Sequence, residues 1–161
     1  MPAPIPAKDL VLVPGLLCTA DLFRAQIAAL DCVIHVADHA GDASVASIAG
    51  RILADAPPRF ALAGLSMGGY IAFEIMRQAP ERVERLALLD TSARADMPEQ
   101  SENRRRLVAL AEKKGVGVPA REMFAKLVAP SRADDAELLT TFLAMAEATG
   151  TEIGRASCRE R

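Results

Sequence analysis

The sequence has few of the residues that mark metal-binding, disulfide-stapled or aromatic-rich proteins. Its 161 residues include no tryptophan, one tyrosine, five phenylalanines, two histidines and three cysteines. Cys18, Cys32 and Cys158 are scattered, and form neither a disulfide framework nor a metal-binding spacing. We therefore expect a reduced, cytoplasmic setting and no bound metal.

Long apolar runs and an excess of one charge are also missing. The amino terminus, MPAPIPAKDL, lacks the basic start and the apolar stretch of a secretion signal. No run approaches the length of a membrane span. The net charge of −2 gives no reason to expect nucleic acid or an anionic membrane as a partner. We therefore expect neither partner.

The first 90 residues alternate between short apolar runs and runs of helical period. The apolar runs predict a strand that runs into a loop over 9–17, and further strands over 31–38, 60–64 and 83–90. The periodic runs predict helices over about 20–30, 44–55 and 67–78. This alternation predicts an α/β fold, with a mostly parallel sheet that helices cover on both faces. The strands are nearly all apolar, as such a doubly covered sheet requires.

The pattern changes after Asp90, where helical segments follow one another without strands. They are predicted over about 101–113, 119–128 and 132–148. Three residues are predicted as helix N-caps in the chain: Thr19, Ser44 and Ser131. The sequence thus predicts a core over residues 1–95 and a helical lid over residues 96–151.

The most informative motif is Gly64-Leu65-Ser66-Met67-Gly68, which fits G-x-S-x-G between a predicted strand and a predicted helix. A strand that turns at once into a helix presses residues 64 and 68 together, so glycines fit there. The serine is forced into a strained conformation and projects from the end of the strand. The helix N-terminus stabilises a developing oxyanion. We therefore predict that Ser66 is a nucleophile and that the Met67 N–H is an oxyanion donor.

A second oxyanion donor is expected from the loop after the first strand. That loop reads Pro14-Gly15-Leu16-Leu17. The N–H of Leu16 is the predicted donor, and its side chain is expected to form a pocket wall. Leu17 is expected to contact the substrate.

The segments LVPGLL, FALAGLSMGGYIA and PERVERLALLDTSAR together resemble the α/β-hydrolase superfamily, in particular its small esterase-like members. The resemblance covers about residues 9–150. It implies a Ser-His-Asp/Glu enzyme with a lid, a small-molecule ester-like substrate and no cofactor. Many members have Trp where this chain has Phe23, which implies a substrate-binding place for Phe23 and a change of pocket shape.

The partners of a nucleophilic serine are missing from the sequence. The superfamily order is serine, then acid, then histidine, but His35 and His39 both precede Ser66. His35 lies in a predicted strand and is expected to be a core residue, and His39 is expected to be a loop residue bonded to solvent. Asp90 ends a strand at the catalytic edge. It is expected to cap the next turn, with catalysis as the alternative.

Residues 152–161, EIGRASCRER, resemble the in-frame translation of a widely used short-read sequencing adapter. The run lacks an apolar period and is expected to contribute nothing to a core. We therefore predict a non-native tail, with the acid and the histidine of the parent protein beyond residue 151. A native Arg-rich tail is the alternative.

Three functional hypotheses stand at this point. The first is a serine hydrolase that acts on carboxylic esters through an acyl-enzyme. Apolar lid residues favour a substrate with an apolar part, or else pack the lid onto the core: Leu107, Leu110, Phe124, Leu127, Phe142 and Met145. Thioesterase, lactonase, acyltransferase, haloperoxidase and C–C hydrolase activities share the scaffold. The second hypothesis is a non-catalytic truncated fragment, and the third is a binding protein that reuses the fold.

Overall fold

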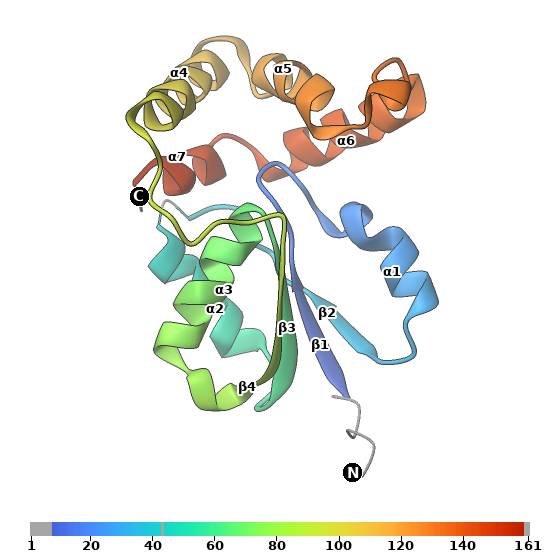
Figure 1. The fold of residues 1–161 in the computed structure, drawn as a ribbon, viewed down its shortest axis with the longest axis vertical. Helices are drawn as coiled ribbons and strands as arrows, with labels where there is room; N and C mark the ends of the chain where they lie inside the picture. The colour runs from blue at the N-terminus through green and yellow to red at the C-terminus, as the bar shows by residue number, and fades with distance from the viewer. Residues whose placement is uncertain (1–7, 43, 160–161) are drawn as a thin grey trace.

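The computed structural model describes residues 8–42 and 44–159, without the side chains of residues 157–159, so the side chain of Cys158 lies outside the description. Within this part, four parallel strands form one sheet in the order β2-β1-β3-β4 (Figure 1). The strands are β1 (Asp9–Val13), β2 (Val33–Val36), β3 (Phe60–Leu65) and β4 (Val83–Leu89). The predicted parallel α/β fold is confirmed.

Helices lie on both faces of the sheet, as the strand–helix alternation predicts (Figure 1). They are η1 (Ala20–Phe23), α1 (Arg24–Ala29), α2 (Val45–Asp55), α3 (Met67–Gln78) and the short turn η2 (Pro80–Arg82). Because successive strand residues point to opposite faces, Val13 joins the large core cluster while its neighbour Leu12 packs with Phe23 and Ala63 in a smaller one. Thr19 and Ser44 cap their helices as predicted.

The remaining helices gather beyond the carboxyl ends of the strands (Figure 1). They are α4 (Pro98–Lys114), α5 (Gly117–Leu127), η3 (Pro130–Arg132) and α6 (Ala136–Thr149). The prediction that Ser131 caps the last of them is wrong. Residues 130–132 form a turn of their own, and the Asp135 carboxylate accepts a hydrogen bond of 2.9 Å from the Leu138 N–H instead.

Residues 152–159 form one more helix, α7 (Glu152–Arg159), below α4 in Figure 1. Ile153 and Ala156 are fully buried in the large core cluster. Arg155 pairs with Glu112 of α4 at 2.7 Å. The expectation that this segment adds nothing to a core is therefore wrong, because the three-residue spacing of Ile153 and Ala156 gives the helix an apolar face.

The edge strand β4 is less covered than the inner strands β1 and β3. Leu86, Leu88 and Leu89 are each 40–42% exposed. This exposure follows from the place of β4 at the edge of the sheet. None of the helices in the described residues combines the length and apolarity that crossing a membrane requires.

Candidate active site

Ser66 is the single residue that connects β3, which ends at Leu65, to α3, which begins at Met67, and it forms the corner between them. Its φ of 52° and ψ of −114° lie outside the ordinary range of a residue with a side chain. Such backbone strain persists only where the surroundings impose it, and it is concentrated at functional sites.

The two glycines of the motif permit this corner because side chains would not fit there. A Cβ on Gly64 would lie 2.4 Å from the Gly68 carbonyl oxygen. A Cβ on Gly68 would lie 2.2 Å from the carbonyl oxygen of Val13, at the end of β1. The glycine spacing in the sequence thus reflects contact between the helix start and two strands.

Three hydrogen bonds to the backbone of Ser66 hold the corner in place. The Ser66 N–H donates to the Leu89 carbonyl at 2.8 Å. The Ser66 carbonyl accepts from the Gly69 N–H at 2.9 Å and from the Thr91 hydroxyl at 2.7 Å. A Cβ on Gly69 would lie 2.4 Å from that hydroxyl oxygen, which explains the last glycine of GLSMGG. Sequence reasoning missed Thr91, whose only signal was its place just after a strand.

Asp90 directly follows β4 with a positive φ of 45°, and its side chain is exposed. Within the described residues its carboxylate accepts no hydrogen bond, so the prediction that it caps the next turn is wrong. The turn is held by its neighbours instead, because Thr91 bonds to Ser66 and the Ser92 hydroxyl accepts from the Arg94 N–H at 3.1 Å.

The loop after β1 lies directly against the serine corner. A Cβ on Gly15 would lie 3.6 Å from the Cβ of Ser66. The loop is a tight turn in which the Cys18 N–H donates to the Gly15 carbonyl at 3.1 Å and Leu17 has a positive φ of 61°. In residues 8–42 and 44–159, the N–H groups of Leu16 and Met67 donate to no protein acceptor. Leu16 follows the glycine that lies against Ser66, and Met67 follows Ser66 directly in the chain.

Cys18 is buried beside this loop, as expected for a small core residue. Burial raises the pKa of its thiol to about 11, so the thiolate is not formed near neutral pH. No cluster of three metal-binding side chains occurs in the described residues.

His39 does not face solvent, which corrects the sequence-based expectation. It is only 2% exposed, and its Nε2 lies 2.9 Å from the Gly15 carbonyl oxygen. Because a carbonyl oxygen only accepts hydrogen bonds, the ring donates from Nε2. Burial lowers the pKa of this imidazole, against a smaller opposing effect of the bond to Gly15. His39 is therefore a neutral ring that binds the loop.

His35 is not a core residue either, because β2 is an edge strand and leaves it half-exposed. Its side chain is 40% exposed, and its Nε2 lies 2.8 Å from Asp9 Oδ1. Both histidines of the sequence thus have partners other than Ser66.

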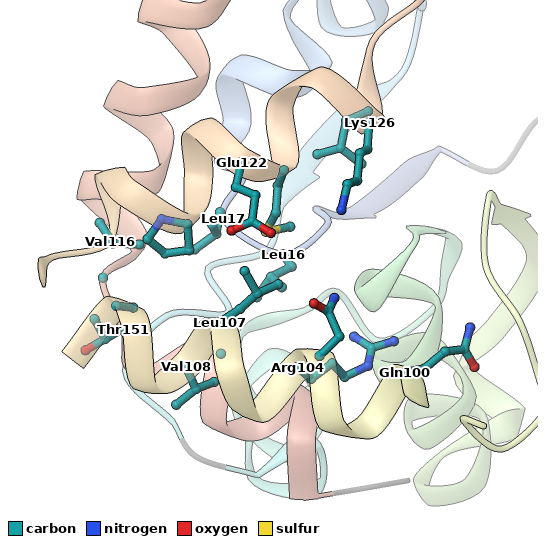
Figure 2. Close-up of a pocket in the computed structure, with 17 residues that line it drawn as sticks. Leu16, Leu17, Gln100, Arg104, Leu107, Val108, Val116, Glu122, Lys126 and Thr151 are labelled. Carbon is teal, nitrogen blue, oxygen red and sulfur yellow. The ribbon is translucent and has the colours of Figure 1, made fainter. Parts of the chain in front are cut away.

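A cavity of about 310 Å³ lies between the Leu16–Leu17 turn and helices α4 and α5 (Figure 2). Its apolar lining includes Leu16, Leu17, Leu107, Val108, Val116, Met123 and Leu127. Its polar lining comprises Gln100, Asn103, Arg104, Glu122, Lys126 and Thr151. Ser66 is not part of this lining, so the cavity adjoins the Leu16–Leu17 turn and not Ser66 itself.

The expected substrate-contacting residues divide between the cavity and the core. Leu17 lines the cavity, whereas Phe23 is buried against Leu12 and Ala63. Of the apolar lid residues, Leu107 and Leu127 line the cavity. The others that are buried in the large core cluster are Phe124, Phe142 and Met145. Some apolar residues of helices α4 to α6 therefore line the cavity, and others pack onto the core.

The family model of the thioesterase domain matches residues 20–161. A thermophilic esterase from Thermogutta terrifontis, solved with malate bound, is 28% identical with a TM-score of 0.77, over 93% of this chain and 62% of its own. A hydrolase from Pseudomonas aeruginosa PA01 is 25% identical with a TM-score of 0.77, over 94% of this chain and 62% of its own.

An enol-lactonase from Burkholderia xenovorans LB400 shares the fold at 23% identity and a TM-score of 0.77, over 94% of this chain and 64% of its own. The chain thus spans less than two thirds of the length of these solved structures, and their α/β-hydrolase fold is its own. A comparison with curated proteins found no match.

Proposed function

The chain belongs to the thioesterase domain family, and we propose that it carries the nucleophile and the oxyanion-binding groups of a serine hydrolase that cleaves carboxylic esters. The observation that carries the proposal is the strained Ser66 corner, with the Gly15 turn packed against it. Two N–H groups without protein acceptors, those of Leu16 and Met67, flank this corner.

The chemistry proceeds by acyl transfer. The Ser66 oxygen attacks the carbonyl carbon of the ester, and the hydroxyl proton passes to a general base. The carbonyl oxygen takes up the negative charge, which the N–H groups of Leu16 and Met67 stabilise. The alcohol then leaves with the proton, and water hydrolyses the acyl-enzyme to regenerate Ser66. Loss of one such donor costs about 10²–10³ in rate in a well-studied protease.

The general base does not come from the described residues. His35 is paired with Asp9, and His39 uses its Nε2 on Gly15. We therefore propose that the histidine and its acid lie in a segment beyond residue 151. Loss of the base alone costs about 10⁶ in rate in subtilisin, so residues 1–161 by themselves are expected to be nearly inactive.

The cavity beside the Leu16–Leu17 turn is the proposed site of the apolar part of the substrate. At about 310 Å³ it is small, near the lower end of the roughly 300–1,000 Å³ range of ligand pockets. The expected substrate is therefore a small ester with a short apolar acyl or alcohol group.

Thioesters are the second candidate substrates, because the matching family is that of the thioesterase domain. The two substrate classes share the acyl-enzyme and differ in the leaving group. Hydrolysis rates of p-nitrophenyl butyrate and of S-butyryl-N-acetylcysteamine, measured side by side, decide between them.

The proposal is tested with the product of the full-length gene. Ser66→Ala is expected to reduce turnover of these substrates by about 10⁶, whereas Ser47→Ala, at an exposed helix position, is expected to leave it unchanged. Equal activity of the wild type and Ser66→Ala would overturn the proposal.

A further inference from the structure

We propose that His39 is a positioning residue for the oxyanion hole, because its bond to the Gly15 carbonyl fixes the direction of the Leu16 N–H. This inference rests on the proposed function, in which that N–H stabilises the oxyanion.

The argument begins with the geometry of one peptide unit. The carbonyl of Gly15 and the N–H of Leu16 belong to the same planar group, and none of the peptide bonds in the described residues is cis. In a trans peptide these two groups point in opposite directions. A donor that holds the carbonyl on one side therefore directs the N–H to the other side.

The anchor on the carbonyl is well built. The His39 ring is 2% exposed and lies 2.9 Å from the Gly15 oxygen, which also accepts the Cys18 N–H at 3.1 Å. Next to this peptide, Leu17 has a positive φ of 61°. A strained turn relaxes unless its surroundings hold it, so the buried donor has a structural task at this position.

His39 is itself held in place from both sides. The guanidinium of Arg51 on α2 donates to the carbonyl of Asp38 at 3.2 Å and to the carbonyl of Ala40 at 2.8 Å. Its Nε donates to the Asp42 carboxylate at 2.9 Å. A continuous series of hydrogen bonds thus leads from α2 through the loop of residues 38–42 to the turn beside Ser66.

This arrangement separates His39 from a catalytic base. A base needs a free ring nitrogen facing the serine hydroxyl, whereas the Nε2 of His39 carries a proton and binds a carbonyl. His39 acts on the reaction through Leu16 alone.

The kinetic test compares His39→Leu, which removes the donor, with His39→Gln, which keeps an N–H donor on a side chain of similar reach. Both are measured in the full-length protein with p-nitrophenyl butyrate, with rates expressed per titrated Ser66. His39→Leu is expected to lower kcat by about 10² with little change in KM, and His39→Gln is expected to recover at least about a tenth of the wild-type kcat.

If His39 were needed only for folding, its replacement would reduce the number of titratable Ser66 sites and leave kcat per site unchanged. That result for His39→Leu, with an active wild type, overturns the inference and leaves the proposed function standing. A wild type without Ser66-dependent turnover overturns the proposed function instead.

A second measurement needs neither activity nor a folded variant. The ring nitrogens of His39 in the wild-type 161-residue protein are observed by ¹⁵N NMR near neutral pH. A proton on Nε2 with a free Nδ1 supports the bond to Gly15. A proton on Nδ1 with a free Nε2 overturns the inference, whatever the kinetic result.

Discussion

The hydroxyl of Thr91 donates a hydrogen bond of 2.7 Å to the carbonyl of Ser66. This contact ties the turn after β4 to the strained corner between β3 and α3, and Thr91 also occupies the space that a side chain on Gly69 would need. The strained conformation of Ser66 is thus held in part by a hydrogen bond from a residue 25 positions later in the chain.

Replacing Thr91 with Val removes this hydrogen bond at nearly constant volume. We expect the free energy of unfolding to fall by about 1 kcal/mol or more, because a half-buried carbonyl loses a partner. Urea unfolding measures the loss. Thr140→Val is the matched control, since the Thr140 hydroxyl bonds to its own helix at an exposed position. Equal stability of Thr91→Val and wild type would contradict the anchoring role.

Gly68→Ala is expected to distort or unfold the corner, because its Cβ would lie 2.2 Å from the Val13 carbonyl oxygen. The control is Gly50→Ala in α2, where the nearest neighbour is a flexible Gln78 side chain at 3.7 Å. That change is expected to stabilise by about 0.5–1 kcal/mol, as Ala is the better helix former. Thermal melts compare the two, and a Gly68→Ala protein as stable as Gly50→Ala would refute the close approach.

The burial of His39 predicts a loss of stability in mild acid. Its folded pKa lies below the ordinary value of 6.5, with Asp38 opposing and Arg51 adding to the shift. Well above pH 6.5 the ring is neutral in both states, and its contribution to the free energy of unfolding no longer changes with pH. Below it the unfolded chain binds a proton first, so the free energy of unfolding falls, by at most about 1.4 kcal/mol per pH unit, until the folded pKa is reached.

The measurement is urea unfolding at several pH values between about 7.5 and 5.5. His39→Gln lacks the titrating ring, so its stability should change less than that of the wild type over this range. Parallel pH profiles for the two proteins would contradict the assignment.

The packing of α7 predicts that Ile153→Ser is costly. Ile153 is fully buried, and removing a buried aliphatic side chain of this size costs about 2–5 kcal/mol. The control Arg155→Ala removes two ion pairs between half-exposed side chains, with Glu112 and with Glu152, which is expected to cost under about 1 kcal/mol. If Ile153→Ser has no effect on the melting temperature, residues 152–159 do not contribute to the core.

Filling the cavity should raise KM more for esters with a long acyl group than for esters with a short one. Leu107→Trp narrows the space beside Leu16 (Figure 2). In the full-length protein we expect KM for p-nitrophenyl hexanoate to rise by about tenfold, as for the loss of a few buried methylenes, with little change for the acetate. Lys113→Trp, at an exposed position of the same helix, should leave KM for both esters unchanged. An equal KM change for both esters would place the acyl group elsewhere.

Local signals predicted the elements that frame the site. The helix over residues 67–78 was predicted with its observed bounds, since the glycine corner starts it and Pro80 stops further extension. The parallel pairing of the strands followed from the alternation of strands and helices, whereas the strand order came from the structure alone. These features depend on residues close together in the sequence.

The features that the sequence did not reveal depend on pairs far apart. The bond between His39 and Gly15 joins residues 24 positions apart, and that between Thr91 and Ser66 joins residues 25 apart. Nothing in the local pattern of either loop indicates its partner. His35 was misjudged because strand position in the sheet, which decides burial, is itself a tertiary property.

The adapter resemblance of residues 152–161 stays a prediction. Reading the source gene across codon 151 from intact template tests it. A reading frame that continues into a strand followed by Asp, and later Gly-His, would supply the acid and the base that the proposed mechanism needs. A gene that encodes EIGRASCRER and then stops would remove the adapter explanation.

The most direct test of the central claim is covalent labelling of Ser66 by an alkyl fluorophosphonate, followed by peptide mass spectrometry, with imidazole in solution as the base for the 161-residue chain. The account predicts a label on Ser66, none in Ser66→Ala, and none on the exposed Ser47. Labelling that is equal in Ser66→Ala, or spread over exposed serines, would show that Ser66 is not an activated nucleophile.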